Sequence, residues 1–172
     1  AEALGCIGRD AIAAVPRLIA LVGHPDKQVR DSAGAAVAKI GPITKVFIPN
    51  LLKLMERTAD TGVRVAAAEA IGYLGTDASR AVAPFANFIS DKSRDLRQAV
   101  IEALGRIGEA SLLVEDVIVS CLNAKDWGVR EATARTCGLI GIQKPDLIAK
   151  LSGLLSDDRG SVRRSAAEAV GV

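Results

Sequence analysis

The amino-acid sequence predicts an all-α protein, a right-handed α-solenoid of about five helix pairs. The first observation behind this prediction is that an arginine recurs at intervals of 34, 33, 33 and 33 residues, with apolar positions in phase with it. The second is that the apolar residues follow the three-to-four-residue spacing of amphipathic helices, without the sustained alternation of a β-strand. A period of about 20–50 residues that persists through the chain is typical of stacked repeats.

The recurring arginine defines the phase of the repeat. It follows a valine or a leucine in each unit, and a glycine comes eleven residues after it in four units. The arginines are Arg30, Arg64, Arg97, Arg130 and Arg163. This phase predicts one array with the approximate units 1–8 (partial), 9–41, 42–75, 76–108, 109–141 and 142–172 (partial).

Each unit is predicted to contain two helices. The first, helix A, is strongly aliphatic, and its five segments are 15–22, 47–55, 82–89, 114–122 and 147–155. Pro16, Pro49 and Pro84 lie near the first turn of three of them, where a missing N–H costs no helical hydrogen bond. The second, helix B, contains the arginine. Asp60 and Asp126 are placed to cap its start, and the glycine after it suits a left-handed C-terminal cap.

Many predicted core positions are alanine, so neighbouring helices can approach closely. One helix pair cannot bury its apolar face alone, whereas a stack of pairs buries it against the next unit. Residues 1–5 match residues 167–171 in pattern, and both segments are typical of helix interiors. We therefore interpret the chain as an array truncated at both ends, and we expect end-to-end self-association through its terminal units.

The repeated motif carries a family resemblance. Its clearest copy, at residues 60–75, follows the pattern Asp-x-x-Val-Arg-x-x-Ala-x-x-Ala-Ile/Leu-Gly-x-Ile/Leu-Gly. This pattern resembles HEAT repeats, which form armadillo-like superhelices, and is most similar to the short, regular subtype first noted in phycobilisome lyase subunits.

The resemblance implies a role for the arginines. In such repeats an aspartate six residues before the arginine joins neighbouring units through a hydrogen-bonded ladder. Asp91 and Asp157 occupy that position here, whereas His24, Thr58 and Ala124 replace it in the other units. We expect the arginines to be structural, pairing with carboxylates or carbonyls of the next unit through charge-assisted hydrogen bonds.

Composition argues against several classes of protein. The 22 Lys and Arg against 20 Asp and Glu leave a net charge of +2, which is no electrostatic footprint for nucleic acid. A run of about 18 uncharged apolar residues, as a membrane span requires, is missing. The three sparse cysteines, Cys6, Cys121 and Cys137, do not suit a disulfide framework, and we expect reduced thiols and a cytoplasmic location. The chain has a single histidine, His24, and no pair of cysteines at the spacing of metal ligands. We therefore predict no metal site, no cofactor and no catalytic residues.

Binding is therefore expected on the exposed surface. The resemblance implies that helices B line the concave face of the solenoid. Positions one, five and nine after each arginine share one helical face that points away from the apolar columns. The candidate partner-binding residues on it are Lys39, Glu69, Tyr73, Glu102, Arg106, Arg135 and Leu139. Their mixed charges suit a protein or peptide better than a phosphate backbone, and Tyr73 and Leu139 are either interface anchors or rim residues that cover their neighbours.

Trp127 is the only tryptophan, and it lies in the predicted turn between helices A and B of its unit. The Asp126-Trp127 pair is similar to turn residues of tubulin-binding TOG domains, which are also built of HEAT repeats. This Trp, however, lies in a late unit, and the other turns lack an obvious basic series. A ring that covers the adjacent helix end and a contact with another protein are the two other interpretations.

The sequence thus predicts a non-enzymatic scaffold or adaptor that binds a protein or peptide along its helix-B face. The alternative, suggested by the repeat subtype alone, is a bilin lyase-type or bilin-handling subunit. Fold-level analogy is a weak reason for such an assignment. Tubulin binding is less favoured for the reasons given above for Trp127. Nucleic-acid binding is less favoured because it would need cations clustered on one face.

Overall fold

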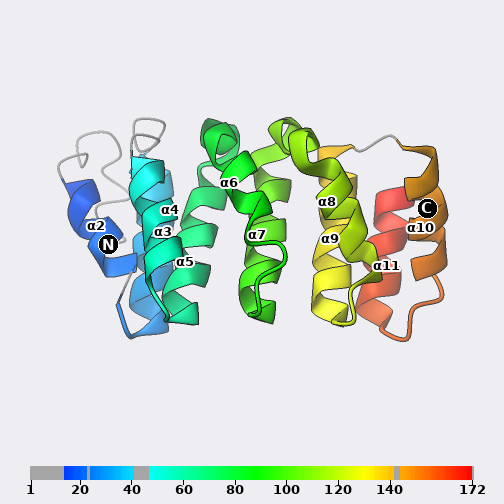
Figure 1. Ribbon diagram of the computed structural model, residues 1–172, viewed down its shortest axis with the longest axis horizontal. Helices are drawn as coiled ribbons and strands as arrows, with labels where there is room; N and C mark the ends of the chain where they lie inside the picture. The colour runs from blue at the N-terminus through cyan, green and yellow to red at the C-terminus, as the bar shows by residue number, and fades with distance from the viewer. Residues whose placement is uncertain (1–13, 23, 41–46, 142–143, 172) are drawn as a thin grey trace.

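The computed structural model describes residues 14–22, 24–40, 47–141 and 144–171. These residues form helices joined by turns, with no β-strand among them (Figure 1). The prediction of an all-α solenoid is therefore confirmed.

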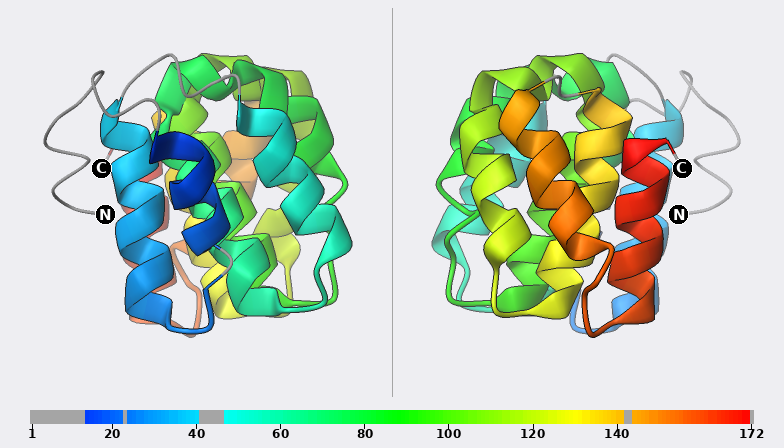
Figure 2. Two further views of the ribbon diagram at one scale, coloured as in Figure 1. Left: turned by 90° about the vertical axis from the view of Figure 1, so that its left-hand side faces the viewer. Right: turned by 90° about the vertical axis from the view of Figure 1, so that its right-hand side faces the viewer.

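The described residues form five helix pairs stacked side by side. Helices A are α2 (Val15–Val22), α4 (Ile48–Arg57), α6 (Val82–Ala86), α8 (Glu115–Ser120) and α10 (Pro145–Leu154). Helices B are α3 (Lys27–Ile40), α5 (Thr61–Tyr73), α7 (Arg94–Ile107), α9 (Trp127–Ile140) and α11 (Gly160–Val170). The two sets make two layers, and in Figure 2 the blue α3 and red α11 project beyond the green α7 and yellow α9. The helix-B layer is therefore concave.

Within the described ranges the structure has short 3₁₀ helices that were not predicted: η3 (Gly75–Ala81), η4 (Gly108–Val114) and η5 (Cys121–Asn123). η3 and η4 lead into α6 and α8, and these two helices A are shorter than their apolar patterns indicate. After α6 the backbone continues in tighter, 3₁₀-type turns: Asn87 N donates to Pro84 O, and Phe88 N donates to Phe85 O. Hydrogen bonds between residues three positions apart are frequent at helix ends.

The two predicted aspartate caps are present, but the predicted left-handed glycine caps are present only in part: the C-cap of α5 is Leu74, before Gly75, and Gly108 ends α7 with φ +81° and ψ −140°, outside the left-handed helical region. The Asp60 carboxylate accepts a hydrogen bond from Val63 N at 3.1 Å. Asp126 Oδ1 accepts from Gly128 N at 2.9 Å and from Val129 N at 3.2 Å, so both aspartates cap their helices B. Gly141 ends α9 in the left-handed conformation with φ +70°, whereas Gly41 lies outside the described residues.

The units are held together by one continuous apolar core. Buried alanines line the contacts between helices B, and larger side chains fill the space between the two layers; Phe85, Leu51 and Ile118 are fully buried there. Small residues also recur where adjacent helices B meet. A β-carbon on Gly138 would come within 3.0 Å of the Ala169 Cα, and one on Gly105 within 2.9 Å of Thr136 Oγ1. This close packing determines the spacing between helices B and therefore the positions of their exposed side chains.

Candidate protein-binding surface

The seven candidate residues lie on four adjacent helices of the concave layer: Lys39 on α3, Glu69 and Tyr73 on α5, Glu102 and Arg106 on α7, and Arg135 and Leu139 on α9. We call this set the concave strip. Glu69 and Glu102 are half-buried and the other five are exposed. In the strip, the two carboxylates are therefore less exposed to solvent than the three cations and the two apolar side chains.

Tyr73 and Arg106 form a contact between neighbouring units. The Arg106 guanidinium carbon lies 4.9 Å from the centre of the Tyr73 ring, a cation–π arrangement. The Tyr73 side chain is nevertheless 50% exposed. An aromatic ring held in place by its neighbour and still open to solvent loses little conformational entropy when a partner covers it.

Glu102 is the centre of a polar network between α7 and α9. It accepts a hydrogen bond from Gln98 Nε2 at 3.1 Å and lies 3.8 Å from Arg106 Nη2. From the next unit, Arg135 Nη1 lies 3.9 Å from Glu102 Oε1, while Arg135 Nη2 pairs with Glu131 at 2.8 Å. Each cation of this part of the strip is therefore placed by at least one carboxylate.

Glu69 is one of the two half-buried carboxylates of the strip. Burial raises the pKa of its carboxyl above the ordinary value, and the nearby negative charge of Asp31 adds to this effect. Lys27 and Arg106 act in the opposite direction and lower the pKa. The net effect of burial and of these neighbouring charges is a raised pKa, so the surroundings of Glu69 disfavour its ionised form.

Leu139 borders a shallow hollow between α9 and α11. The hollow has a volume of about 360 Å³ and is also lined by Arg135, Glu168 and Ala169. The Leu139 side chain itself is 64% exposed. An apolar side chain beside a hollow with charged residues on its edge could contact one side chain of a bound segment.

The recurring arginines lie at the other end of helices B, in the turns. Arg64 Nη2 donates to Asp91 at 2.7 Å, and Arg130 Nε donates to Asp157 at 2.7 Å; each aspartate belongs to the next unit. The neighbouring guanidinium in each case holds the pKa of the Asp91 and Asp157 carboxyls below the usual value. These two pairs join successive units through charge-assisted hydrogen bonds.

The carbonyl partners of the arginines differ from the expectation. They belong to the arginine's own turn, five and six residues earlier in the chain, and not to the next unit. Four arginines donate from Nη1 to this pair of carbonyls: Arg30, Arg97, Arg130 and Arg163. Arg64 instead donates from Nε to Met55 O at 2.9 Å. Each arginine thus bonds to a backbone carbonyl of its own unit, and Arg64 and Arg130 also pair with the next unit.

A family model for HEAT repeats matches residues 1–71, 48–115 and 114–171, which together span almost the whole chain. The chain belongs to the HEAT-repeat family. Among curated protein sequences none matches this chain. Six solved structures similar to this HEAT-repeat array share 16–20% sequence identity with it, so they show its fold alone.

Three of these structures illustrate the range. A chain in the complex of CpcE and CpcF of phycocyanin lyase from Nostoc sp. PCC7120 matches with a TM-score of 0.78 and 20% identity, over 92% of this chain and 98% of that one. A designed armadillo repeat protein in complex with the peptide (KR)4 matches with a TM-score of 0.63 and 17% identity, over 99% and 88%. An archaeal HEAT-like repeat protein from Thermococcus onnurineus NA1 matches with a TM-score of 0.58 and 16% identity, over 96% and 72%.

Trp127 lies outside the concave strip, on the edge of the HEAT array that the A–B turns form. It is the first residue of α9 and is 37% exposed. The guanidinium carbons of Arg94, from the preceding unit, and Arg159, from the next, each lie 5.7 Å from the ring centre. The ring therefore bridges three units, and a partner that contacted its faces would have to displace an arginine.

Burial disfavours the reactive thiolate form of the two cysteines that the structure describes. Burial raises the pKa of the Cys137 thiol to about 12, and burial also raises that of Cys121. Cys6 lies outside the described residues. Within the part of the chain that the structure describes, His24 belongs to no metal-binding cluster, and no helix is both long and apolar enough to cross a membrane.

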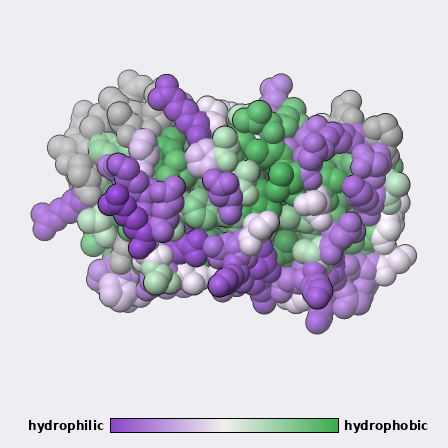
Figure 3. All heavy atoms as spheres, in the orientation of Figure 1, coloured by the Kyte–Doolittle hydropathy of each residue, from purple (hydrophilic) through white to green (hydrophobic). Residues whose placement is uncertain are grey.

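The opposite, helix-A face also carries exposed apolar side chains. Figure 3 shows this face, where apolar surface gathers over the middle of the layer. Leu113 on η4, Val117 on α8 and Ile148 on α10 are exposed apolar residues of these elements. This face is therefore a useful comparison surface for any test of the strip.

Proposed function

We propose that this HEAT-repeat chain is a non-enzymatic scaffold that binds an extended segment of another protein along its concave strip. The observation that carries the proposal is the arrangement of Tyr73, Arg106 and Leu139 on three neighbouring helices of one concave layer. Tyrosine and arginine are enriched among residues that dominate binding energy. Exposed aromatic, basic and aliphatic groups are thus available together to one partner.

The charges of the strip define the partner. Lys39, Arg106 and Arg135 supply positive charge, whereas Glu69 and Glu102 supply negative charge from half-buried positions. A segment with both acidic and basic side chains, and an apolar side chain to cover Tyr73, complements this pattern. A nucleic acid would need several cations aligned without intervening carboxylates. The designed armadillo protein in complex with the peptide (KR)4 supports peptide binding by a similar fold.

A peptide selection tests this function directly. Peptides from a random library would be selected on the wild-type chain, and their affinities compared with those for the double variant Tyr73→Ala, Arg106→Glu. We expect the double variant to lose at least about tenfold in affinity, because both residues lie at the centre of the strip. The matched control is Arg80→Glu, the same charge reversal at an exposed position on η3, which should change affinity less than about twofold.

Two results would contradict the proposal. In the first, selected peptides bind the double variant as well as the wild type. In the second, they lose affinity instead for Leu113→Ser, which would place binding on the helix-A face.

Self-association through the terminal units and a cytoplasmic location stay predictions. A sedimentation run that shows only monomer at high concentration would refute self-association.

The second candidate is a bilin lyase-type or bilin-handling subunit. Its support is the similarity to a chain of the CpcE–CpcF complex, which this chain matches over nearly the full length of both. Against it, Tyr73 is the one aromatic residue of the concave strip, and a tetrapyrrole site is expected to be a concave, largely apolar pocket. Mixing the chain with a bilin tests this candidate, because bound bilin changes its visible absorbance. A saturable change would favour it, and an unchanged spectrum would exclude it.

A further inference from the structure

The hydrogen-bonded ladder between units is interrupted at Arg97. Arg64 and Arg130 each pair with an aspartate of the next unit, whereas the equivalent position opposite Arg97 is Ala124. Arg97 Nη1 donates to the carbonyls of Asp91 at 2.7 Å and Lys92 at 3.2 Å. Among the residues that the structure describes, no carboxylate forms an ion pair with the Arg97 guanidinium.

The same alanine leaves a backbone N–H without an acceptor. In the other four turns, the side chain six residues before the arginine accepts a hydrogen bond from the N–H two residues later, at 2.8–3.1 Å. The four acceptors are His24, Thr58, Asp91 and Asp157. Ala124 has no acceptor atom, and within the described ranges Asp126 N finds no hydrogen-bond partner.

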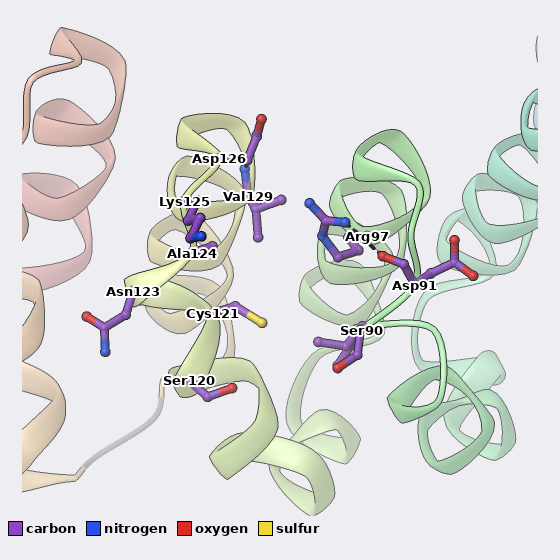
Figure 4. A pocket seen from close by; sticks show the side chains of 11 residues that line it. Ser90, Asp91, Arg97, Ser120, Cys121, Asn123, Ala124, Lys125, Asp126 and Val129 are labelled. Carbon is purple, nitrogen blue, oxygen red and sulfur yellow. Dashed lines mark hydrogen bonds between the residues drawn. The ribbon is translucent and has the colours of Figure 1, made fainter.

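An open cavity lies beside Ala124, where the ladder aspartate is missing. It lies between the α6–α7 turn and the α8–α9 turn and has a volume of about 440 Å³. Arg97, Cys121 and Ala124 line it, together with Lys125 and Asp126 (Figure 4). Figure 4 shows Arg97 and Cys121 extending into the gap from opposite sides. We call this cavity the Ala124 pocket.

We propose that the Ala124 pocket binds a carboxylate group, which takes the place of the missing ladder aspartate. The intact ladder shows how one carboxylate serves both donors. Asp157 Oδ2 accepts from Arg130 Nε at 2.7 Å, and its Oδ1 accepts from Arg130 Nη2 at 3.0 Å and from Arg159 N at 2.9 Å. In the Ala124 pocket the corresponding donors are the Arg97 guanidinium and the Asp126 N–H.

The chemistry of the pocket selects a planar, singly charged anion. A guanidinium presents a planar fork of donors that matches a carboxylate. Lys125 adds positive charge, but Asp91 and Asp126 also line the pocket. These two carboxylates would repel a doubly charged phosphate more than a carboxylate. The carboxylate can come from a small free acid or from an acidic side chain of a peptide, and this site lies on the turn edge, independent of the concave strip.

The test follows two donors by NMR. Acetate and the blocked tripeptide acetyl-Ala-Glu-Ala-amide would each be titrated into the wild-type chain while the Asp126 N–H and Arg97 Nε–H resonances are observed. We expect saturable shifts of both resonances with each probe, and weaker binding of inorganic phosphate. Tighter binding of the tripeptide would assign the site to a protein partner, and tighter binding of acetate to a small free acid.

Three variants make the test specific. Ala124→Asp supplies the carboxylate internally, and we expect it to raise the Tm and to weaken binding of both probes roughly tenfold or more. Ala124→Asn places an uncharged side chain beside the two donors and should weaken binding as well, which keeps the test valid if the aspartate variant folds poorly. Thr58→Asp is the matched control, because it adds an aspartate at the equivalent position opposite Arg30 and should leave binding unchanged. Unsaturable shifts in the wild type, equal shifts in Ala124→Asp, or tighter binding of phosphate would overturn the proposal.

Discussion

Gly72 on α5 lies against Ala103 on α7 so closely that a β-carbon on Gly72 would come within 2.8 Å of the Ala103 Cα. Glycine recurs at this position, eight residues after the arginine, in three successive units, as Gly72, Gly105 and Gly138. Each faces the residue six positions after the next unit's arginine. The spacing between helices B, and with it the position of Tyr73 relative to Arg106, therefore depends on the absence of a side chain.

Replacing Gly72 by alanine is expected to destabilise the fold. The added methyl group meets backbone as well as side-chain atoms of Ala103, so α7 has to shift, at a cost of about 1–3 kcal/mol. The matched control is Gly153→Ala on α10, where a β-carbon would meet nothing within 4 Å. There alanine should stabilise the helix by about 0.5–1 kcal/mol. Chemical denaturation of both variants measures the difference, and equal effects would refute the close-packing explanation.

Asp157 and Asp158 allow the contribution of the ladder to be measured. Both pair with Arg130, at 2.7 and 2.9 Å, but their side chains are 6% and 74% exposed. Asp157→Asn leaves the mostly buried Arg130 guanidinium with only the exposed Asp158 as a charge partner and should cost about 3 kcal/mol. Asp158→Asn should cost less than about 1 kcal/mol, as for surface ion pairs in general.

The ladder also predicts a pH dependence. Arg130 lowers the pKa of Asp157 in the folded chain, so the folded state favours the ionised form. This stability is present at neutral pH and is lost as the pH falls below the carboxyl's usual pKa of 3.8 toward its lowered value. The stability difference between the wild type and Asp157→Asn should therefore shrink in strong acid. A constant difference down to low pH would show that the pair is not ionic.

Glu69 predicts the opposite pH dependence. Burial, with the charge of Asp31, raises its pKa above 4.5 in the folded chain, so ionisation opposes folding. Its favourable contribution is complete below pH 4.5 and is lost as the pH rises through the raised pKa. Glu69→Gln should therefore have a higher Tm than the wild type at pH 7 and no advantage at pH values below 4.5. Glu168→Gln, at the equivalent exposed position of α11, controls for the loss of one negative charge.

The helix pairs and the strip were predictable because they depend on local geometry. The 3.6-residue period places positions five and nine after each arginine on one face, whatever the next unit contains. Asp60 and Asp126 were predictable as caps for the same reason, since a cap bonds to an N–H two or three residues away. Tyr73 and Leu139 are exposed where this periodicity placed them.

Contacts between units could not be derived in this way. The Tyr73–Arg106 pair and the Ala124 pocket depend on the register between neighbouring helices, which the period of one chain segment does not define. The 3₁₀ helices η3 and η4 were missed because their three-residue hydrogen bonds leave no distinct periodicity. The glycine eight residues after the arginine recurs in the repeated motif and was visible in the sequence. Which residue of the next helix B it contacts followed only from the structure.

The environment of Trp127 gives a last prediction, because the chain has no other tryptophan to contribute fluorescence. Arg159 lies 5.7 Å from the ring centre and pairs only distantly with Asp158, at 3.8 Å. Arg159→Gln should remove this cation from the ring, at a cost of about 0.5–1 kcal/mol. Red-shifted emission and faster quenching by acrylamide would report the uncovered ring, and Arg164→Gln on α11 should change neither. If Arg159→Gln leaves both signals unchanged, the arginine does not cover the indole in solution, and the Trp127 edge is open to a partner.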